Sequence, residues 1–207
     1  MPGILILLLL AAMACGEMSG SVHTASCVPE APCLDTDALH ARAVSAAKGI
    51  TVSHDKNILL KRSSFDKITK KERLHGCVLL KICDFYQAVF SLKLNLSEQD
   101  HISDRQGVFV DLVGLMQRLR RCVRVKEHKC RHLYAQAEQK SLTETTNEKR
   151  RGAKDWAIIQ ITKLQRATEE LMESETQDRA VDELQALHSY IPGKGVRRRM
   201  PIKAPNK

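Results

Sequence analysis

No proline occurs between Cys33 and Ile191, an interval of 159 residues. A proline inside a helix removes a backbone hydrogen-bond donor and clashes with the preceding turn, so its absence permits long, uninterrupted helices. Apolar residues in this interval recur at spacings of three and four positions, which is the period of a helix buried on one face. Strand-like alternation is lacking, and the chain is long enough for one sizeable core. The sequence therefore predicts an all-α, single-domain bundle.

The apolar pattern predicts about six helices. The most regular covers residues 77–94, where the spacing alternates between four and three at Val78, Ile82, Phe85, Val89 and Leu92. A second stripe, behind Ser103, consists of Val108, Leu112, Leu115, Leu119 and Cys122. Other helical segments are expected at 35–49, 56–71 and 178–191, the first of them starting at Asp35, whose carboxylate suits a helix N-terminus. A further helix is expected to carry Ala157, Ile161, Leu164 and Leu171, with Thr145 and Glu148 as its candidate caps. The structure of residues 131–155 is left open.

The N-terminal segment has the pattern of a secretory signal peptide. An apolar run from Ile4 to Ala12 is followed by small residues, and this run is shorter than the roughly 20 residues that a membrane span needs. Cleavage is expected after Ala14 or Gly16, and the second choice leaves an even six cysteines by removing Cys15. A bacterial lipoprotein anchored through Cys15 is the weaker alternative. We therefore expect a signal peptide at 1–16 and a secreted, extracellular protein with a domain at 17–191.

The cysteines are interpreted as disulfide partners, because a secretory leader directs the chain to an oxidising environment. His128, Cys130 and His132 lie close together, but they lack a fourth ligand and Cys130 suits a disulfide better. The carboxylate pairs Glu169–Glu170 and Asp182–Glu183 are interpreted as solvated helix faces. The sequence contains no glycine-rich phosphate loop and no nucleophile motif. We expect neither an enzyme nor a metal or cofactor site.

Three segments resemble the interleukin-10 family of helical cytokines. Residues 74–90 combine a cysteine at the start of a helix with the aromatic pair Phe85–Tyr86 and then Val89–Phe90. Leu119–Cys122, followed by Cys130, resembles the end of that family's fourth helix, and residues 179–191 resemble its final helix. The resemblance extends in patches from Cys27 to Ile191. Cys33 and Cys83 are outside the family's common pattern.

The resemblance implies the disulfides Cys27–Cys122 and Cys77–Cys130. Cys33 and Cys83 would then be left to form a third bond. Spacing alone leaves every pairing of six cysteines open.

The resemblance also implies a function in receptor binding. Family members act as monomers or intertwined dimers that bridge two class II cytokine receptor chains and start JAK–STAT signalling. One branch implies the interleukin-20 receptor alpha chain and the interleukin-10 receptor beta chain as partners. Contacts come from the first helix, the following loop and the last helix, which makes Lys56, Asn57, Lys61 and Asp182 the candidate receptor-binding residues. An ordinary exposed polar role is the alternative for each of them.

Positive charge suggests a second type of partner. The net charge is +9, and residues 1–16 contribute nothing to it, so the mature chain would attract polyanions such as heparan sulfate or extracellular nucleic acid. The alternative function is accordingly a cationic host-defence factor that binds anionic membranes, glycosaminoglycans or DNA. Residues 192–207 are expected to form a disordered basic tail. The candidate polyanion-binding residues are Arg118, Arg120, Arg121, Arg124, Lys194, Arg197, Arg198 and Arg199; solvated surface is the simpler interpretation.

Asn95 begins the sequence Asn95–Leu96–Ser97, an N-glycosylation sequon. It is predicted to carry a glycan close to a helix end in a eukaryotic host.

Overall fold

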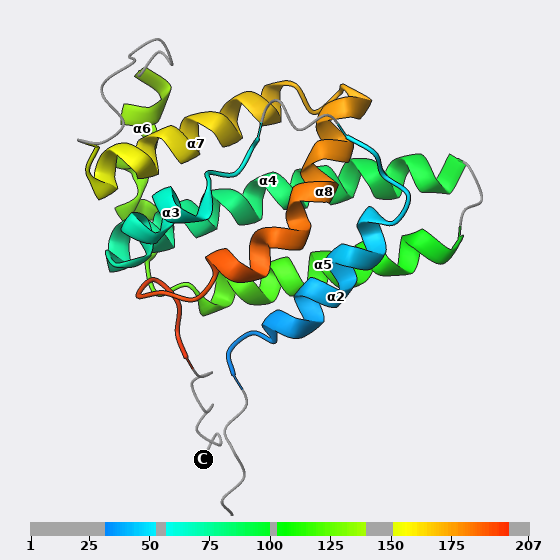
Figure 1. Ribbon diagram of the computed structural model, residues 1–207, viewed down its shortest axis with the longest axis horizontal. Coiled ribbons are helices and arrows are strands. Elements are labelled where there is room, and N and C mark those ends of the chain that lie inside the picture. The colour runs from blue at the N-terminus through cyan, green and yellow to red at the C-terminus, as the bar shows by residue number, and fades with distance from the viewer. Residues whose placement is uncertain (1–31, 53–56, 100–102, 140–150, 199–207) are drawn as a thin grey trace, which may run out of the picture. The chain divides into compact units, whose positions relative to one another are not determined.

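The computed structural model describes residues 32–52, 57–99, 103–139 and 151–198, and the regular elements in these ranges are helices (Figure 1). The predicted all-α, disulfide-linked bundle is confirmed. The helices are α2 (Thr36–Ala47), α3 (Arg62–Thr69), α4 (Glu72–Gln99), α5 (Ser103–Cys122), the short 3₁₀ helix η2 (Glu127–Lys129), α6 (Arg131–Gln139), α7 (Ala153–Glu169) and α8 (Ser174–Tyr190). None of the helices in these ranges is long and apolar enough to cross a membrane.

Helix α4 forms the centre of the bundle and packs against α3, α5, α7 and α8. It is longer than the predicted 77–94 at both ends. Its core residues include an aromatic series in which the ring centroids of Phe85 and Tyr86 lie 5.2 Å apart and those of Tyr86 and Phe90 lie 5.8 Å apart. Phe109 of α5 extends this series, with its centroid 5.9 Å from that of Phe90. The aromatic pair identified in the sequence therefore lies in the core.

Helix α2 begins where its cap was expected. The Oδ1 atom of Asp35 accepts hydrogen bonds from the backbone N–H groups of Asp37 (3.0 Å) and Ala38 (2.9 Å), two donors that otherwise lack a partner at a helix N-terminus. Leu39 and the alanines of its inner stripe are buried, and small side chains allow α2 to pack closely on α8 and α5. After the helix ends, Gly49 adopts a positive φ of 79°, which suits glycine at a helix terminus.

Within the described ranges, two disulfides join the helices, Cys33–Cys122 and Cys77–Cys130, while Cys83 is a buried free thiol. The structure thus contains the implied Cys77–Cys130 bond. The implied Cys27–Cys122 bond is wrong, because Cys33 lies just before α2 and reaches the C-terminus of α5. Cys27 itself lies outside the described residues. The expected Cys33–Cys83 bond is also wrong, because Cys33 is bonded to Cys122 and Cys83 is packed into the core in the middle of α4.

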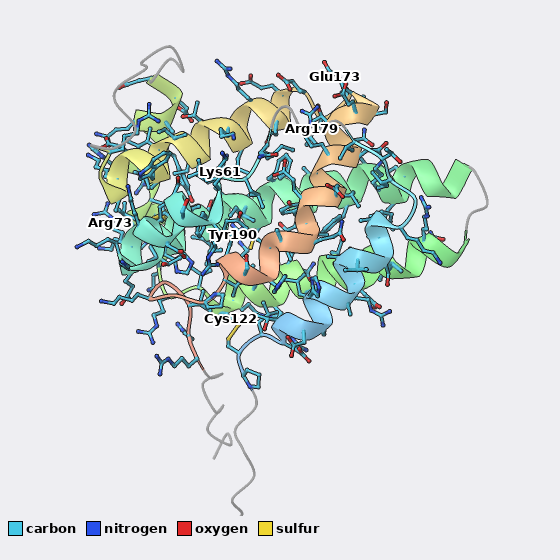
Figure 2. All side chains as sticks on the ribbon, viewed as in Figure 1. Lys61, Arg73, Cys122, Glu173, Arg179 and Tyr190 are labelled. Carbon is cyan, nitrogen blue, oxygen red and sulfur yellow. A yellow bond between two sulfur atoms is a disulfide. The ribbon has the colours of Figure 1, made fainter. Side chains whose placement is uncertain are left out.

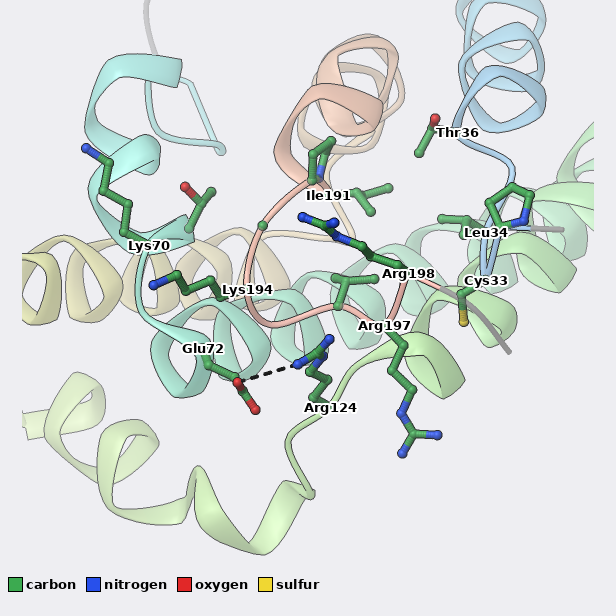
Figure 3. Close-up of a pocket in the computed structure, with 15 residues that line it drawn as sticks. Cys33, Leu34, Thr36, Lys70, Glu72, Arg124, Ile191, Lys194, Arg197 and Arg198 are labelled. Carbon is green, nitrogen blue, oxygen red and sulfur yellow. Dashed lines mark ion pairs between the residues drawn. The ribbon is translucent and has the colours of Figure 1, made fainter. Parts of the chain in front are cut away.

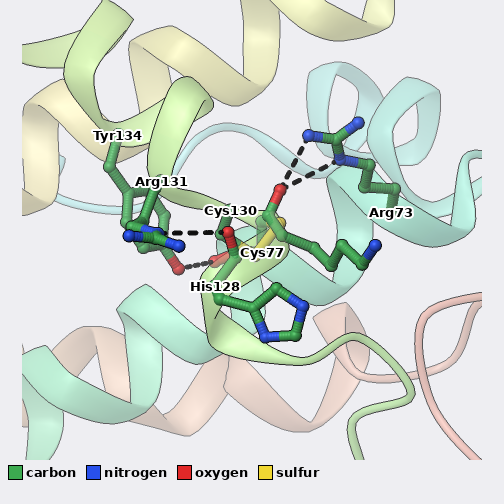
Figure 4. The surroundings of a disulfide bond; sticks show 7 residues. Arg73, Cys77, His128, Cys130, Arg131 and Tyr134 are labelled. Atoms are coloured by element: carbon green, nitrogen blue, oxygen red, sulfur yellow. Dashed lines mark hydrogen bonds between the residues drawn. A yellow bond between two sulfur atoms is a disulfide. The ribbon is translucent and has the colours of Figure 1, made fainter.

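The Cys77–Cys130 bond attaches the polar segment after α5 to the start of α4 (Figure 4). The hydroxyl of Tyr134 in α6 donates a hydrogen bond to the Cys77 carbonyl at 2.9 Å. Arg73 donates from Nε (3.1 Å) and Nη2 (2.7 Å) to the Lys129 carbonyl. Of the region 131–155, which the sequence left open, residues 131–139 form α6 and the last three residues begin α7.

Residues 192–198 are not a disordered tail. Their backbone pairs with the end of α5: Arg124 N–H donates to the Gly195 carbonyl (2.8 Å), and Arg197 N–H donates to the Cys122 carbonyl (2.9 Å). Cys33 N–H donates to the Arg198 carbonyl at 3.2 Å. This ordering was missed because it depends on backbone pairing between distant segments, which composition does not reveal. Residues 199–207 lie outside the described residues.

Candidate functional site

An extended segment between α2 and α3, residues 57–61, runs across α8 and is called the strap. The carboxylate of Glu183 in α8 accepts two backbone hydrogen bonds from it, from Ile58 N–H to Oε1 (2.7 Å) and from Leu59 N–H to Oε2 (2.6 Å). Burial raises the pKa of Glu183 above its ordinary value, and the two hydrogen bonds partly oppose this rise. The carboxylate of Glu183 therefore attaches two adjacent residues of the strap to the last helix.

Two further side chains complete the attachment of the strap. Gln160 of α7 accepts a bond from Leu60 N–H (2.7 Å) and donates one to the Ile58 carbonyl (3.0 Å). The hydroxyl of Tyr190 in α8 donates to the Leu60 carbonyl at 2.7 Å. Figure 2 labels Tyr190 and, in the strap, Lys61. A segment without regular structure needs such partners, because its buried backbone groups lose their bonds to water.

Glu183 and Gln160 are the residues that sequence reasoning missed. Glu183 was interpreted as part of a solvated helix face, whereas its carboxylate binds buried backbone. Gln160 is fully buried and lies between the core residues Ala157 and Ile161 of α7. A polar residue within an apolar helical stripe was the available signal, because a buried amide needs hydrogen-bond partners.

Three of the four receptor-binding candidates lie on the strap or beside its attachment to α8. Asn57 and Lys61, at its two ends, are exposed, and Asp182 immediately precedes the anchoring Glu183 on α8. The Oδ1 atom of Asp182 also accepts a hydrogen bond from Gln185 Nε2 at 3.0 Å. Lys56 lies outside the described residues.

Helix α2 borders the same face on the other side of α8 (Figure 1). His40 of α2 and His188 of α8 both hydrogen-bond through Nδ1 to the Gln185 carbonyl, at 3.0 and 2.8 Å. Their ring centroids are 4.2 Å apart. The strap, α2 and α8 therefore form one surface, and this surface combines exposed polar residues with a firmly held backbone.

A second candidate site is a groove beside the Cys33–Cys122 bond, which we call the basic groove (Figure 3). Its volume is about 930 Å³. Glu72 provides the single carboxylate of the lining and lies 3.8 Å from Arg124. The lining includes five cationic residues, all of them exposed: Lys70, Arg124, Lys194, Arg197 and Arg198. Tertiary structure thus brings Arg124, which follows α5, together with the cationic residues of the 194–198 segment.

The remaining polyanion candidates are placed differently. Arg118 and Arg121 are exposed on α5, away from the groove lining. Arg120 is paired with Asp84 and with Glu127, the latter at 2.7 Å. Partial burial disfavours its charge, but the two carboxylates outweigh that effect and raise the pKa of Arg120. Arg120 therefore serves an internal ion-pair network, and Arg199 lies outside the described residues.

The structure also locates the metal-ligand and glycosylation candidates of the sequence. Cys130 is consumed by its disulfide, and the described ranges contain no cluster of three or more potential metal ligands among His, Cys, Asp and Glu. Asn95 is exposed on α4. Its sequon lies inside this helix, because α4 continues past the predicted end at residue 94.

No protein-family model, curated protein or solved structure matches this chain. Evidence on function therefore comes from its own surfaces and from the short resemblances in its sequence.

Proposed function

We propose that this protein is a secreted helical cytokine of the interleukin-10 family, which binds a pair of class II cytokine receptor chains and triggers JAK–STAT signalling in immune or epithelial responses. The observation that carries the proposal is the continuous face made by α2, the strap and α8. These are the three segments from which receptor contacts come in that family. The role is binding, with no chemical step.

The cross-linked helical bundle supports this proposal. Its two disulfides are typical of proteins that fold outside the reducing cytosol, and Cys77–Cys130 is a bond that the resemblance implies. Among family members the resemblance is closest to interleukin-26, which indicates the interleukin-20 receptor alpha and interleukin-10 receptor beta chains as partners. The use of Cys33 as the partner of Cys122 departs from the implied pattern.

The residues of this face have two roles: some are exposed for contact with a partner, and others hold the strap in place. Asn57, Lys61 and Asp182 present polar groups at its surface. Beneath them, Glu183 and Gln160 hold the strap through its backbone, so that the contact residues keep their positions before a partner arrives. Such preorganisation lowers the conformational entropy lost on binding.

Charge reversal on this face tests the proposal. The purified secreted protein is titrated against immobilised ectodomains of the two receptor chains, and STAT phosphorylation is measured in cells that express both. Lys61→Glu and Asp182→Lys are expected to weaken binding at least tenfold. Lys154→Glu, an exposed charge at the start of α7, is the control and should bind normally. Absence of binding to either chain, or equal losses for Lys61→Glu and Lys154→Glu, would refute the proposal.

A second candidate function, polyanion binding, is favoured by the basic groove. Five cations against one carboxylate provide several contacts to sulfate or phosphate groups, with a strong dependence on salt. The groove lining contains no aromatic residue, so nucleic acid would be bound without base stacking and regardless of sequence.

Neutralisation of charges in the groove tests this function without removing residues 192–198, which are part of the fold. Arg197→Gln combined with Arg198→Gln should elute from heparin at lower salt than the wild type. Arg118→Gln combined with Arg121→Gln removes the same charge from α5 and serves as the control. If both pairs shift the elution equally, net charge and not the groove accounts for binding.

A further inference from the structure

His75 of α4 is a fully buried histidine whose two ring nitrogens both bind backbone. Its Nε2 lies 2.9 Å from the Tyr190 carbonyl at the end of α8, and its Nδ1 accepts the Gly195 N–H at 3.1 Å. A carbonyl can only accept and a backbone N–H can only donate. The two bonds therefore specify the neutral ring with its proton on Nε2.

The bond from Gly195 secures the segment that builds the basic groove. The Gly195 carbonyl accepts from Arg124, and Val196 forms an isolated bridge with Val123. Packing here leaves no space: a Cβ on Gly193 would lie 2.5 Å from His75 Cε1, and one on Gly195 would lie 2.5 Å from the backbone nitrogen of α4 next to His75. The His75 ring therefore packs directly against the 193–198 segment and holds it in position.

We propose that His75 is an acid-sensitive latch, whose protonation releases the 193–198 segment and dismantles the basic groove. A proton added at Nδ1 removes the acceptor of the Gly195 N–H and places two donors face to face. The freed segment carries Lys194, Arg197 and Arg198 away from their fixed positions. The bundle itself remains cross-linked by Cys77–Cys130 and Cys33–Cys122.

The surroundings of the ring set the pH range. Burial lowers the pKa of His75 below its ordinary value of 6.5, the bond to the Tyr190 carbonyl partly opposes this, and Arg62 of α3 lowers it further. Other ionisable groups on the neighbouring elements include Asp66 of α3, which pairs with Arg62 at 2.8 Å, and the phenol of Tyr190. Lys194 lies in the segment itself, and Glu72, one turn earlier on α4, is directed to Arg124. When the segment is closed, its contacts disfavour a proton on His75, and when it is open, the ring accepts that proton. Closure is therefore complete above about pH 6.5 and weakens as the pH falls.

Hydrogen exchange of the intact, oxidised protein tests the latch. After correction for intrinsic rates, amides 194–197 are expected to open more often at pH 5.5 than at pH 7.5, by up to about tenfold, because one proton is taken up on opening. Amides in the middle of α4 and α7 should not change. Unchanged protection at 194–197, or an equal change throughout the helices, would overturn the proposal.

Two variants and one spectrum identify the titrating group. His75→Gln supplies a donor and an acceptor that do not titrate, and its exchange at 194–197 should be independent of pH. His40→Gln removes an exposed histidine of α2 and should keep the wild-type response. If His75→Gln does not fold, nitrogen NMR of the wild-type imidazole decides: an Nδ1–H tautomer at pH 7.5 contradicts the latch, and Nδ1 protonation coinciding with segment opening supports it. These results do not depend on receptor binding.

Discussion

Removal of the Cys33–Cys122 bond should have a large and specific effect on stability. The bond joins residues separated by 89 positions, and the loss of chain entropy in the unfolded state gives about 4.6 kcal/mol for a loop of this length. The same relation gives about 4.2 kcal/mol for the 53-residue separation of Cys77 and Cys130. Either loss is a large part of the net stability of a typical domain.

The assay is urea unfolding followed by circular dichroism. The double variant Cys33→Ser/Cys122→Ser is compared with the wild type and with Cys27→Ser, the cysteine that the family resemblance pairs with Cys122. We expect the double variant to lose several kcal/mol and Cys27→Ser to unfold like the wild type. Two results would refute the pairing and the reasoning built on it. One is a loss below about 1 kcal/mol for the double variant. The other is destabilisation by Cys27→Ser together with a free Cys33 thiol.

Three further substitutions or reagents test individual sites. Glu183→Gln replaces one of the two acceptor oxygens with an NH2 group, so a strap N–H loses its acceptor, and the change should cost about 1–3 kcal/mol in urea unfolding. The half-exposed Asp182→Asn should cost under about 1 kcal/mol, and equal costs would contradict the anchoring role. Burial raises the pKa of Cys83 to about 12, so iodoacetamide at pH 8 should label it only after unfolding, and rapid labelling of the native protein would show that the thiol is accessible. Gly195→Ala places a Cβ against the backbone of α4 and should abolish exchange protection at 194–197 even at neutral pH. The control is Gly114→Ala, where a Cβ meets nothing within 4 Å, and it should be neutral or stabilising by about 0.5–1 kcal/mol. Protection retained in Gly195→Ala would show that the segment adapts to the added methyl group.

The positions of the helices followed from local information. Spacing of apolar residues predicted α4 and its aromatic core, and Asp35 marked the start of α2, because both features act within one or two turns of the chain. Helix ends were less exact: α8 begins at Ser174, four residues before the expected start. The buried face of α5 is also rotated slightly from the predicted one. Phe109 and Met116 are buried, whereas the predicted core residues Val108 and Leu115 are half-buried.

The candidate sites depended on contacts between distant segments. Spacing carries no information on which sulfur atoms meet, so Cys33 was not recognised as the partner of Cys122. Likewise, Glu183 became an anchor only because folding places the strap against α8, and residues 192–198 became ordered only because α5 and His75 offer them backbone partners. Helix formation is decided by neighbours along the chain, and the sequence alone therefore determined the class of fold. Surfaces for partners are made where residues far apart in the chain come together, and these were determined by the tertiary structure.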